Sequence, residues 1–464
     1  MSGSPTQPTV AIAGGGLAGL AAGCALADSG FRVTLFERRP YLGGRASSYE
    51  HPGTGEIVDN CQHVLFRVCT NLVEFYRRIG VEDRIRWYDE MTFIEPGGRA
   101  SVLRASPLPA PLHTAPSFLR FPFLSAHDKL VISRAIAALT LSVPADTGQS
   151  FLEWCRRHGQ TENAIQRFWK PILVSALSED LELISIAYAA QVVRESMKSP
   201  EARHMGVPSI PLTALYNCAG DYIRQRGGEI FFRTALDSFL AGARVRIRTG
   251  EAERDFDYLV LALPFDTVER VLPQTDEAAP LREKLSHFET SPITGIHLWF
   301  DRQISDLDHA VLLDRTIQWM FHKSRLLSGS AGSTPSYIEL VVSASKTLIE
   351  KSRSEIVDLA LAEVCEFFPG AREANLVKSA VIKEVGAVFS PRPGIDVCRP
   401  AQTTAWPRVF LAGDFTATGW PATMEGAVRS GYLAAEALAN AAGMNSRQFL
   451  SPDMPASGLM RLFH

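Results

Sequence analysis

The chain has 464 residues, 46% of them hydrophobic, and a formal net charge of −3 at neutral pH. This length exceeds a single simple core and predicts about two or three domains. No lysine- or arginine-rich run accompanies the near-neutral charge, which excludes nucleic acid as the expected partner. The seven cysteines are scattered and none forms a CxxC pair, so we expect no disulfide framework and no metal site.

The first part of the chain has a strand–turn–helix–strand pattern. A short apolar run, Val10–Ala13, predicts a buried strand, and the Ala- and Leu-rich stretch Leu17–Ser29 predicts a helix that ends before Gly30. A second strand is expected over Arg32–Glu37. This order of elements predicts the first βαβ unit of an α/β nucleotide-binding domain.

Three glycines and one acid carry the chemistry of this unit. Gly14 permits the tight turn, Gly16 lets a pyrophosphate approach the backbone, and Gly19 lets the helix pack closely on the strand. The free N–H groups of the helix N-terminus attract the phosphates, and Glu37 at the strand tip can accept hydrogen bonds from a ribose. The pattern favours dinucleotide binding over an ordinary Gly-rich turn.

A second glycine- and acid-containing segment lies near the C-terminus. A strand is expected over Val409–Ala412, Gly413 and Asp414 follow at its tip, and a helix is expected over Met424–Asn440. The carboxylate can bind hydroxyl groups, and the helix N-terminus can face the part of a reduced flavin that carries negative charge. The alternative is a plain strand–loop–helix with capping residues.

The intervening chain predicts two further regions. Prolines exclude regular structure over 105–123, after which helices are expected at 128–141, 151–158, 163–177 and 184–198. A hairpin over 91–103, strands at 229–233, 257–263, 295–300, 316–321 and 337–343, and helices at 71–79, 212–226 and 354–368 complete the pattern.

These elements divide the chain into discontinuous domains. We expect a nucleotide-binding domain built from 1–100, 206–290 and 386–445, a helical insertion at 101–205, an α+β substrate domain at 291–385, and a tail at 446–464.

The order of these motifs resembles the superfamily of flavin-dependent amine oxidases and carotenoid desaturases. GGGLAGL at the first turn, Glu37, Gly43-Gly44-Arg45 and the terminal AGD and MEGA segments match it from end to end. The runs Asp59–Leu65 and Gly419–Ala427 are similar to the squalene-associated branch, the hydroxysqualene dehydroxylases. Cys61 departs from that branch, in which glycine is expected.

The resemblance implies a fold and a cofactor. The fold is α/β, with a Rossmann-type, glutathione reductase-like FAD-binding domain, an α+β substrate domain and a helical insertion. The implied FAD contacts are Gly14, Gly16, Gly19, Glu37, Arg38, Gly44, Arg45, Gln62, His63, Leu236, Gly413, Asp414 and Met424. His63 is a candidate catalytic residue or a residue that shapes the pocket. Glu425 is a candidate acid, or a carboxylate that caps a helix.

The resemblance also implies a reaction. Reduced flavin would replace the hydroxyl group of hydroxysqualene by hydride, giving squalene for hopanoid synthesis, with electrons from an external donor that the sequence does not identify. A carotenoid (phytoene-type) desaturase or another flavin oxidase remains open, because the same scaffold can run hydride the other way. A non-redox prenyl-binding escort protein and an NAD-dependent dehydrogenase are further alternatives, which the intact MEGA segment and Gly43–Arg45 disfavour.

The expected substrate is a hydrocarbon that dissolves in lipid, so we expect the enzyme to dock on a membrane. The N-terminus has no signal-peptide pattern, and no apolar stretch reaches the roughly 18 residues of a spanning helix. We therefore expect a cytoplasmic protein that is peripheral on the inner face of the membrane. The Phe-rich, basic segment 105–141, which includes Phe118 and Phe121, is the expected docking patch, with packing in the core as the alternative.

Overall fold

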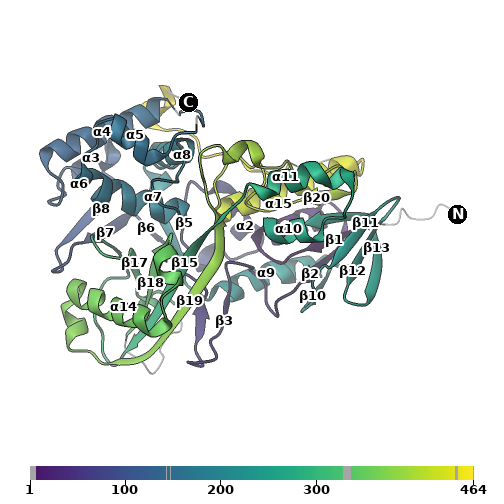
Figure 1. The fold of residues 1–464 in the computed structure, drawn as a ribbon, viewed down its shortest axis with the longest axis horizontal. Helices are drawn as coiled ribbons and strands as arrows, with labels where there is room; N and C mark the ends of the chain where they lie inside the picture. The colour runs from purple at the N-terminus through teal and green to yellow at the C-terminus, as the bar shows by residue number, and fades with distance from the viewer. Residues whose placement is uncertain (1–6, 143, 147, 328–335, 445–447, 463–464) are drawn as a thin grey trace.

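The computed structural model describes residues 7–142, 144–146, 148–327, 336–444 and 448–462. Figure 1 shows three regions: a helical cap at the upper left, a large sheet below it, and a nucleotide-binding domain on the right. This arrangement agrees with the predicted α/β class, and the segments of the nucleotide-binding domain come from separated parts of the chain.

A five-stranded parallel sheet forms the centre of the nucleotide-binding domain. Its order is β10-β2-β1-β14-β20. The strands are β1 (Thr9–Ala13), β2 (Arg32–Glu37), β10 (Glu229–Phe232), β14 (Tyr258–Leu261) and β20 (Val409–Leu411). All five predicted strands are confirmed. The apolar side chains of β1, β2, β14 and β20 are buried on both faces, as expected for a parallel sheet covered by helices, whereas those of the edge strand β10 are half-buried.

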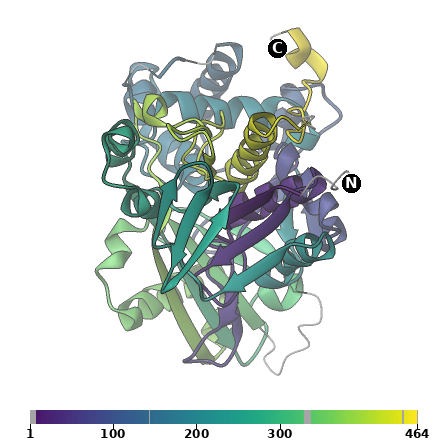
Figure 2. The same cartoon turned by 90° about the vertical axis from the view of Figure 1, so that its right-hand side faces the viewer.

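Helices from three parts of the chain cover this sheet. They are α1 (Leu17–Asp28), α9 (Leu212–Gln225) and α15 (Met424–Ala441). Helix α15 packs directly on α1. The two backbones come so close that a Cβ at Gly431 would lie 2.3 Å from the Ala18 carbonyl oxygen. The C-terminal helix is therefore packed against the first helix, as Figure 2 shows for the yellow and purple segments.

A three-stranded antiparallel meander extends from this domain. It consists of β11 (Ser238–Ala241), β12 (Val245–Thr249) and β13 (Ala252–Phe256). The sequence analysis missed it. The alternation of buried and exposed residues along β12 was its signal, and charged residues on the exposed face obscured it.

The region predicted as the substrate domain contains a seven-stranded sheet of order β19-β15-β18-β17-β16-β7-β8. The strands are β7 (Glu90–Ile94), β8 (Ala100–Arg104), β15 (Thr290–Phe300), β16 (His309–Leu312), β17 (Trp319–Phe321), β18 (Ser336–Ser343) and β19 (Leu376–Phe389). Helix α14 (Arg353–Phe367) covers one face. The predicted hairpin at 91–103 is confirmed, and it pairs with β16 of this sheet. The boundary drawn at residue 100 therefore divides a single hairpin.

The helical insertion contains α3 (Ala115–Phe118), α4 (Ala126–Leu141), α5 (Phe151–Arg157), α6 (Glu162–Ala164), a π-helical turn (Ile165–Trp169), α7 (Lys170–Leu177) and α8 (Ile186–Met197). The prediction that 105–123 has no regular structure was wrong for α3. Its proline, Pro116, lies in the first turn, where no backbone donor is lost.

Two phenylalanines of the expected docking patch lie in the core instead. Phe118 and Phe121 are 6% and 1% exposed, and they pack with Phe93, Phe123 and Phe168. The hydrophobic effect places these rings inside, so they form no surface.

Smaller elements connect the three regions. They are β3 (Ser48–Glu50), β4 (Ile57–Asp59), β5 (Leu65–Phe66), α2 (Thr70–Arg78), β6 (Ile85–Tyr88), β9 (Met205–Pro208), α10 (Phe265–Val271), α11 (Ala279–Ser286), α12 (Lys323–Leu326) and α13 (Lys346–Ile349). Within the described ranges, no helix combines the length and the apolar character that crossing a bilayer requires.

Candidate functional site

A large pocket lies where the three regions meet. It extends from the first glycine turn, at Gly14 and Gly16, to Trp319 and Phe321 of the seven-stranded sheet. Nearly all of the predicted cofactor contacts line it: Gly14, Gly16, Glu37, Arg38, Gly44, Arg45, Gln62, His63, Leu236, Gly413, Asp414 and Met424. The two ends of the chain therefore supply one site, as the sequence predicts.

The glycine turn leaves a cradle at the N-terminus of α1. Gly14 has a positive φ of 108°, and a Cβ there would lie 2.2 Å from the Ala262 carbonyl oxygen. Gly44, at φ 61°, comes so close that its Cβ would lie 2.9 Å from the Cα of Gly16. No side chain caps the helix at Gly16, so its first N–H groups are available to phosphate oxygens. This cradle fits a pyrophosphate.

Gly19 lies behind the cradle and does not line the pocket. A Cβ at this position would lie 2.0 Å from the Gly14 carbonyl oxygen, so any larger residue would push α1 away from the turn. Gly19 therefore acts through helix packing, which is the physical role that its spacing predicted.

Glu37 is fixed at the end of β2. Its carboxylate accepts hydrogen bonds from the backbone N–H of Gly15 and of Arg39, both at 2.7 Å. These bonds fasten the acid to the glycine turn, so the predicted ribose contact is held next to the glycine cradle. Leu236 follows β10 on the same side of the pocket, and the exposed Arg38 side chain lies at its edge.

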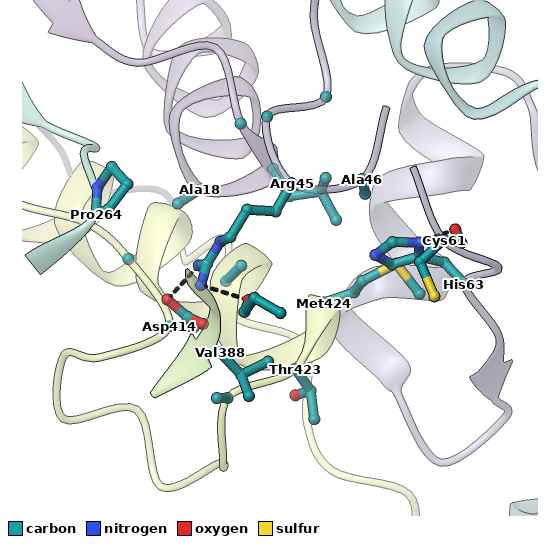
Figure 3. Close-up of a pocket in the computed structure, with 18 of the residues that line it drawn as sticks. Ala18, Arg45, Ala46, Cys61, His63, Pro264, Val388, Asp414, Thr423 and Met424 are labelled. Carbon is teal, nitrogen blue, oxygen red and sulfur yellow. Dashed lines mark hydrogen bonds and ion pairs between the residues drawn. The ribbon is translucent and has the colours of Figure 1, made fainter. Parts of the chain in front are cut away.

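Arg45 and Asp414 join the first and last segments of the domain. The Arg45 guanidinium donates to Asp414 Oδ1 at 2.7 Å and to the Ala387 carbonyl at 2.9 Å (Figure 3). Burial acts to lower the pKa of Arg45, but the Asp414 carboxylate outweighs it, so the pKa is raised. Buried Arg399 holds the following loop by donating to the Asp414 and Thr416 carbonyls. Sequence reasoning did not identify Arg399.

His63 has a defined tautomer. Its Nδ1 lies 2.8 Å from the Cys61 carbonyl oxygen, which can only accept, so Nδ1 carries the proton. Burial lowers the pKa of His63, and the ring is therefore neutral at pH 7 with an acceptor lone pair on Nε2. A ring in this state can take up a proton. Burial also raises the pKa of the Cys61 thiol well above its ordinary value, which makes this cysteine a packing residue.

Glu425 lies outside the pocket, although Met424 beside it lines the pocket. Its fully buried carboxylate accepts from the backbone N–H groups of Asn71 and Leu72 and from the Asn71 side chain. These groups form the N-terminal turn of α2, so Glu425 caps one helix from the first turn of another. Of the two roles open to it, this geometry matches the cap.

The far end of the pocket is apolar and was not identified from sequence. Trp319 and Phe321 of β17 stack at 5.5 Å, Val341 lies on the neighbouring strand β18, and Ile293 lies on β15, the next strand along the sheet. The Trp319 indole N–H donates to Ser175 of α7, which joins this wall to the helical insertion. Sequence analysis predicted strands over 316–321 and 337–343, and a strand from 295 that begins after Ile293, but only the packing shows which faces line the pocket.

Comparison with known proteins places these features in a family. Residues 17–439 match the family model described as flavin containing amine oxidoreductase. A 15-cis-phytoene desaturase of Synechococcus elongatus is 28% identical over 92% of this chain and 95% of its own. A probable zeta-carotene desaturase of the same species is also 28% identical, over 93% and 98%.

Solved structures share the fold. Cyclohexylamine oxidase from Brevibacterium oxydans has a TM-score of 0.66 at 18% identity, covering 95% of this chain and 100% of its own. The glycine cradle, the acid at the tip of β2 and the Arg45–Asp414 pair fit FAD. The chain therefore belongs to the family of flavin-containing amine oxidoreductases and is an FAD-dependent oxidoreductase with a Rossmann-type cofactor domain.

Proposed function

We propose that this protein exchanges hydride between its flavin and an allylic carbon of a long isoprenoid chain. The supporting observation is the continuous pocket, polar at the cofactor cradle and apolar at the wall of Trp319, Phe321, Ile293 and Val341. A wall of this kind offers an isoprenoid chain hydrophobic contact and excludes water. Bound FAD supplies hydride chemistry at N5 of its ring.

The first candidate reaction is desaturation. It removes a hydride and a proton from neighbouring carbons, so it requires a base beside the chain. His63 suits this role, because its neutral ring has a free acceptor at Nε2. The relatives named as phytoene and zeta-carotene desaturases, which match along more than nine-tenths of the chain, support this candidate.

The second candidate is the reductive removal of the hydroxyl group of hydroxysqualene. The sequence runs at 59–65 and 419–427 favour it, since they resemble the hydroxysqualene dehydroxylases. The reaction protonates the hydroxyl group, releases water and adds hydride to the allylic carbon, with an external donor reducing the flavin. It requires a proton donor where desaturation requires a base.

Product analysis tests both candidates with the same purified holoenzyme. The oxidised enzyme is supplied with phytoene and a quinone acceptor, and the anaerobically reduced enzyme is supplied with hydroxysqualene. A product two hydrogens poorer than phytoene supports the first candidate, and squalene supports the second. Failure of both, with FAD bound and reducible, would contradict an isoprenoid substrate.

We also propose a lipid bilayer as the surface from which the substrate enters. Exposed leucines gather on the helical insertion and the neighbouring C-terminal turn: Leu108, Leu112, Leu119, Leu130, Leu141, Leu459 and Leu462. The Lys129 ammonium donates to the Leu119 carbonyl, so the first part of α4 lies against the end of α3, and Arg120 and Arg134 are also exposed. Apolar and basic side chains together suit an anionic membrane surface.

A further inference from the structure

A buried cluster of charged groups contacts Gln62, one of the residues that line the pocket. Asp59, at the end of β4, Lys323, at the start of α12, and Glu339, in β18, are 4%, 1% and 0% exposed. None of the three lines the pocket, and neither sequence reasoning nor the FAD contacts described above account for them. Ionisable side chains are rarely buried unless paired, so this cluster requires an explanation.

Gln62, which lines the pocket, connects the cluster to it. The Lys323 ammonium lies 2.6 Å from Asp59 Oδ2 and 2.7 Å from Gln62 Oε1. The Gln62 amide nitrogen donates to the His63 carbonyl at 3.1 Å. The oxygen and the nitrogen of the Gln62 side-chain amide are therefore both fixed. The segment Cys61–His63 is held beside the pocket by Lys323, which comes from α12 next to the seven-stranded sheet.

We propose that Lys323 is a positioning residue for Cys61, Gln62 and His63, which line the pocket. Its ammonium group holds the Gln62 side chain, and the Asp59 carboxylate balances the charge of Lys323. The charge state of Glu339 modulates the bond between Lys323 and Gln62. Asp59 is itself fixed, because it accepts from the Ser48 hydroxyl at 2.6 Å and from the Leu212 N–H at 3.2 Å. The link thus runs from the nucleotide-binding domain through Lys323 to the substrate sheet. The inference rests on the proposed function only where turnover is measured, since the flavin spectrum requires bound FAD alone.

Glu339 makes the link sensitive to pH. Its carboxylate lies 3.3 Å from the Lys323 ammonium, and burial raises its pKa to about 7 although Lys323 acts to lower it. The other titratable groups facing it are Asp59, His297 across the strand pair, Tyr337 and Cys61. Burial keeps these last three neutral near pH 7, with the pKa of His297 lowered to about 3. Above pH 7 a second carboxylate therefore competes with Gln62 for Lys323.

The test uses the holoenzyme and four cluster variants. K323M and D59N/K323M remove the link, the latter without leaving Asp59 as an unpaired buried carboxylate; K323R keeps the charge; E339Q removes the titration. The matched control is K198M, because Lys198 is also a buried lysine in an ion pair, with Glu195 at 2.8 Å, but lies outside the pocket lining. The readouts are the absorption spectrum of bound FAD as a function of pH, and kcat separately from KM.

We expect D59N/K323M to retain FAD with shifted absorption bands and a kcat lowered about 10- to 100-fold, because a small misplacement at a reacting centre has effects of this size. K323R should restore part of the kcat, and E339Q should lose the spectral transition near pH 7. K198M should match the unaltered enzyme in all readouts. A spectrum and kcat of folded D59N/K323M that match those of K198M would overturn the proposal. If the Lys323 variants do not fold, E339Q decides: a retained transition overturns the proposal and a lost one supports it.

Discussion

Single residues in this protein connect distant parts of the chain, and the Arg45–Asp414 pair is the clearest case. Arg45 follows the second glycine turn, and Asp414 follows the last strand of the sheet. Each side chain orders the other beside the cradle, so the pair makes the cofactor site depend on the C-terminal segment having folded.

This dependence gives a prediction at the residue scale. D414A should bind FAD about 10- to 100-fold more weakly, because it leaves the Arg45 guanidinium without its carboxylate and removes a hydrogen-bonding group from the site. Fluorescence titration of the apoprotein with FAD measures the affinity. D255A is the matched control, since Asp255 pairs with Arg246 on the β12–β13 hairpin away from the pocket. Equal affinities of the two variants would contradict a role of Asp414 in FAD binding.

At the scale of elements, helix α15 supplies two functions from one turn. Met424 lines the pocket, and the next residue, Glu425, caps α2. Burial raises the pKa of Glu425, while the α2 N–H groups act to lower it. A substitution of Glu425 should therefore affect activity through the stability of the contact between α2 and α15.

The predicted consequence separates a cap from a catalytic acid. E425A should lower the free energy of unfolding by about 1–3 kcal/mol, since two buried backbone donors lose their acceptor. E425Q keeps one acceptor oxygen and should lose less. Thermal unfolding measures stability, and kcat is normalised to bound FAD. A large fall in normalised kcat for stable E425Q would instead indicate that Glu425 takes part in the reaction.

The helical insertion gives a second prediction at this scale. It concerns the exposed leucines, because the phenylalanines that the sequence predicted as membrane contacts are buried. L119D/L130D should reduce sedimentation with anionic liposomes, because two side chains that are 59% and 53% exposed would become charged. Thermal stability and FAD content should stay unchanged. L240D is the control, since Leu240 is 67% exposed on β11 at the opposite end of the molecule (Figure 1). Equal sedimentation of both variants would argue against this docking surface.

At the scale of the whole molecule, buried histidines set the response to acid. His113, His309 and His322 each have a pKa lowered to about 4, and His297 one lowered to about 3, because burial disfavours the charged ring. Between pH 6.5 and 4 the unfolded chain binds protons that the folded chain does not, so stability falls as pH falls. Glu339 acts in the opposite sense: its raised pKa costs stability as pH rises from 4.5 to about 7.

We therefore predict a steep loss of stability below pH 6.5, with each histidine contributing up to about 1.4 kcal/mol per pH unit. Urea unfolding at pH 7, 6 and 5 measures the slope. H309L should make the slope shallower, whereas H127N should leave it unchanged because His127 is exposed. If H309L leaves the slope of stability against pH unaltered, this would contradict the contribution of buried His309 to the loss of stability in acid.

The sequence alone determined the cofactor half of this protein. The glycine spacing at 14–19, the acid at 37 and the strand–acid–helix order at 409–440 are local patterns, because a tight turn, a strand tip and a helix N-terminus each form from neighbouring residues. The five strands of the parallel sheet and helices α1, α9 and α15 were predicted for the same reason, within a few residues of their ends, whereas the β11–β13 meander was missed.

Tertiary structure decided what no local pattern contains. The burial of Phe118 and Phe121, the α2 cap at Glu425, the sheet partner of the 90–104 hairpin and the ion pair of Lys323 with Asp59 all depend on contacts between residues far apart in sequence. Periodicity shows that a side chain is apolar or charged, but only the packing of three regions shows which partner it meets. The cofactor could therefore be predicted from sequence, whereas the apolar wall and the charged cluster behind it could not.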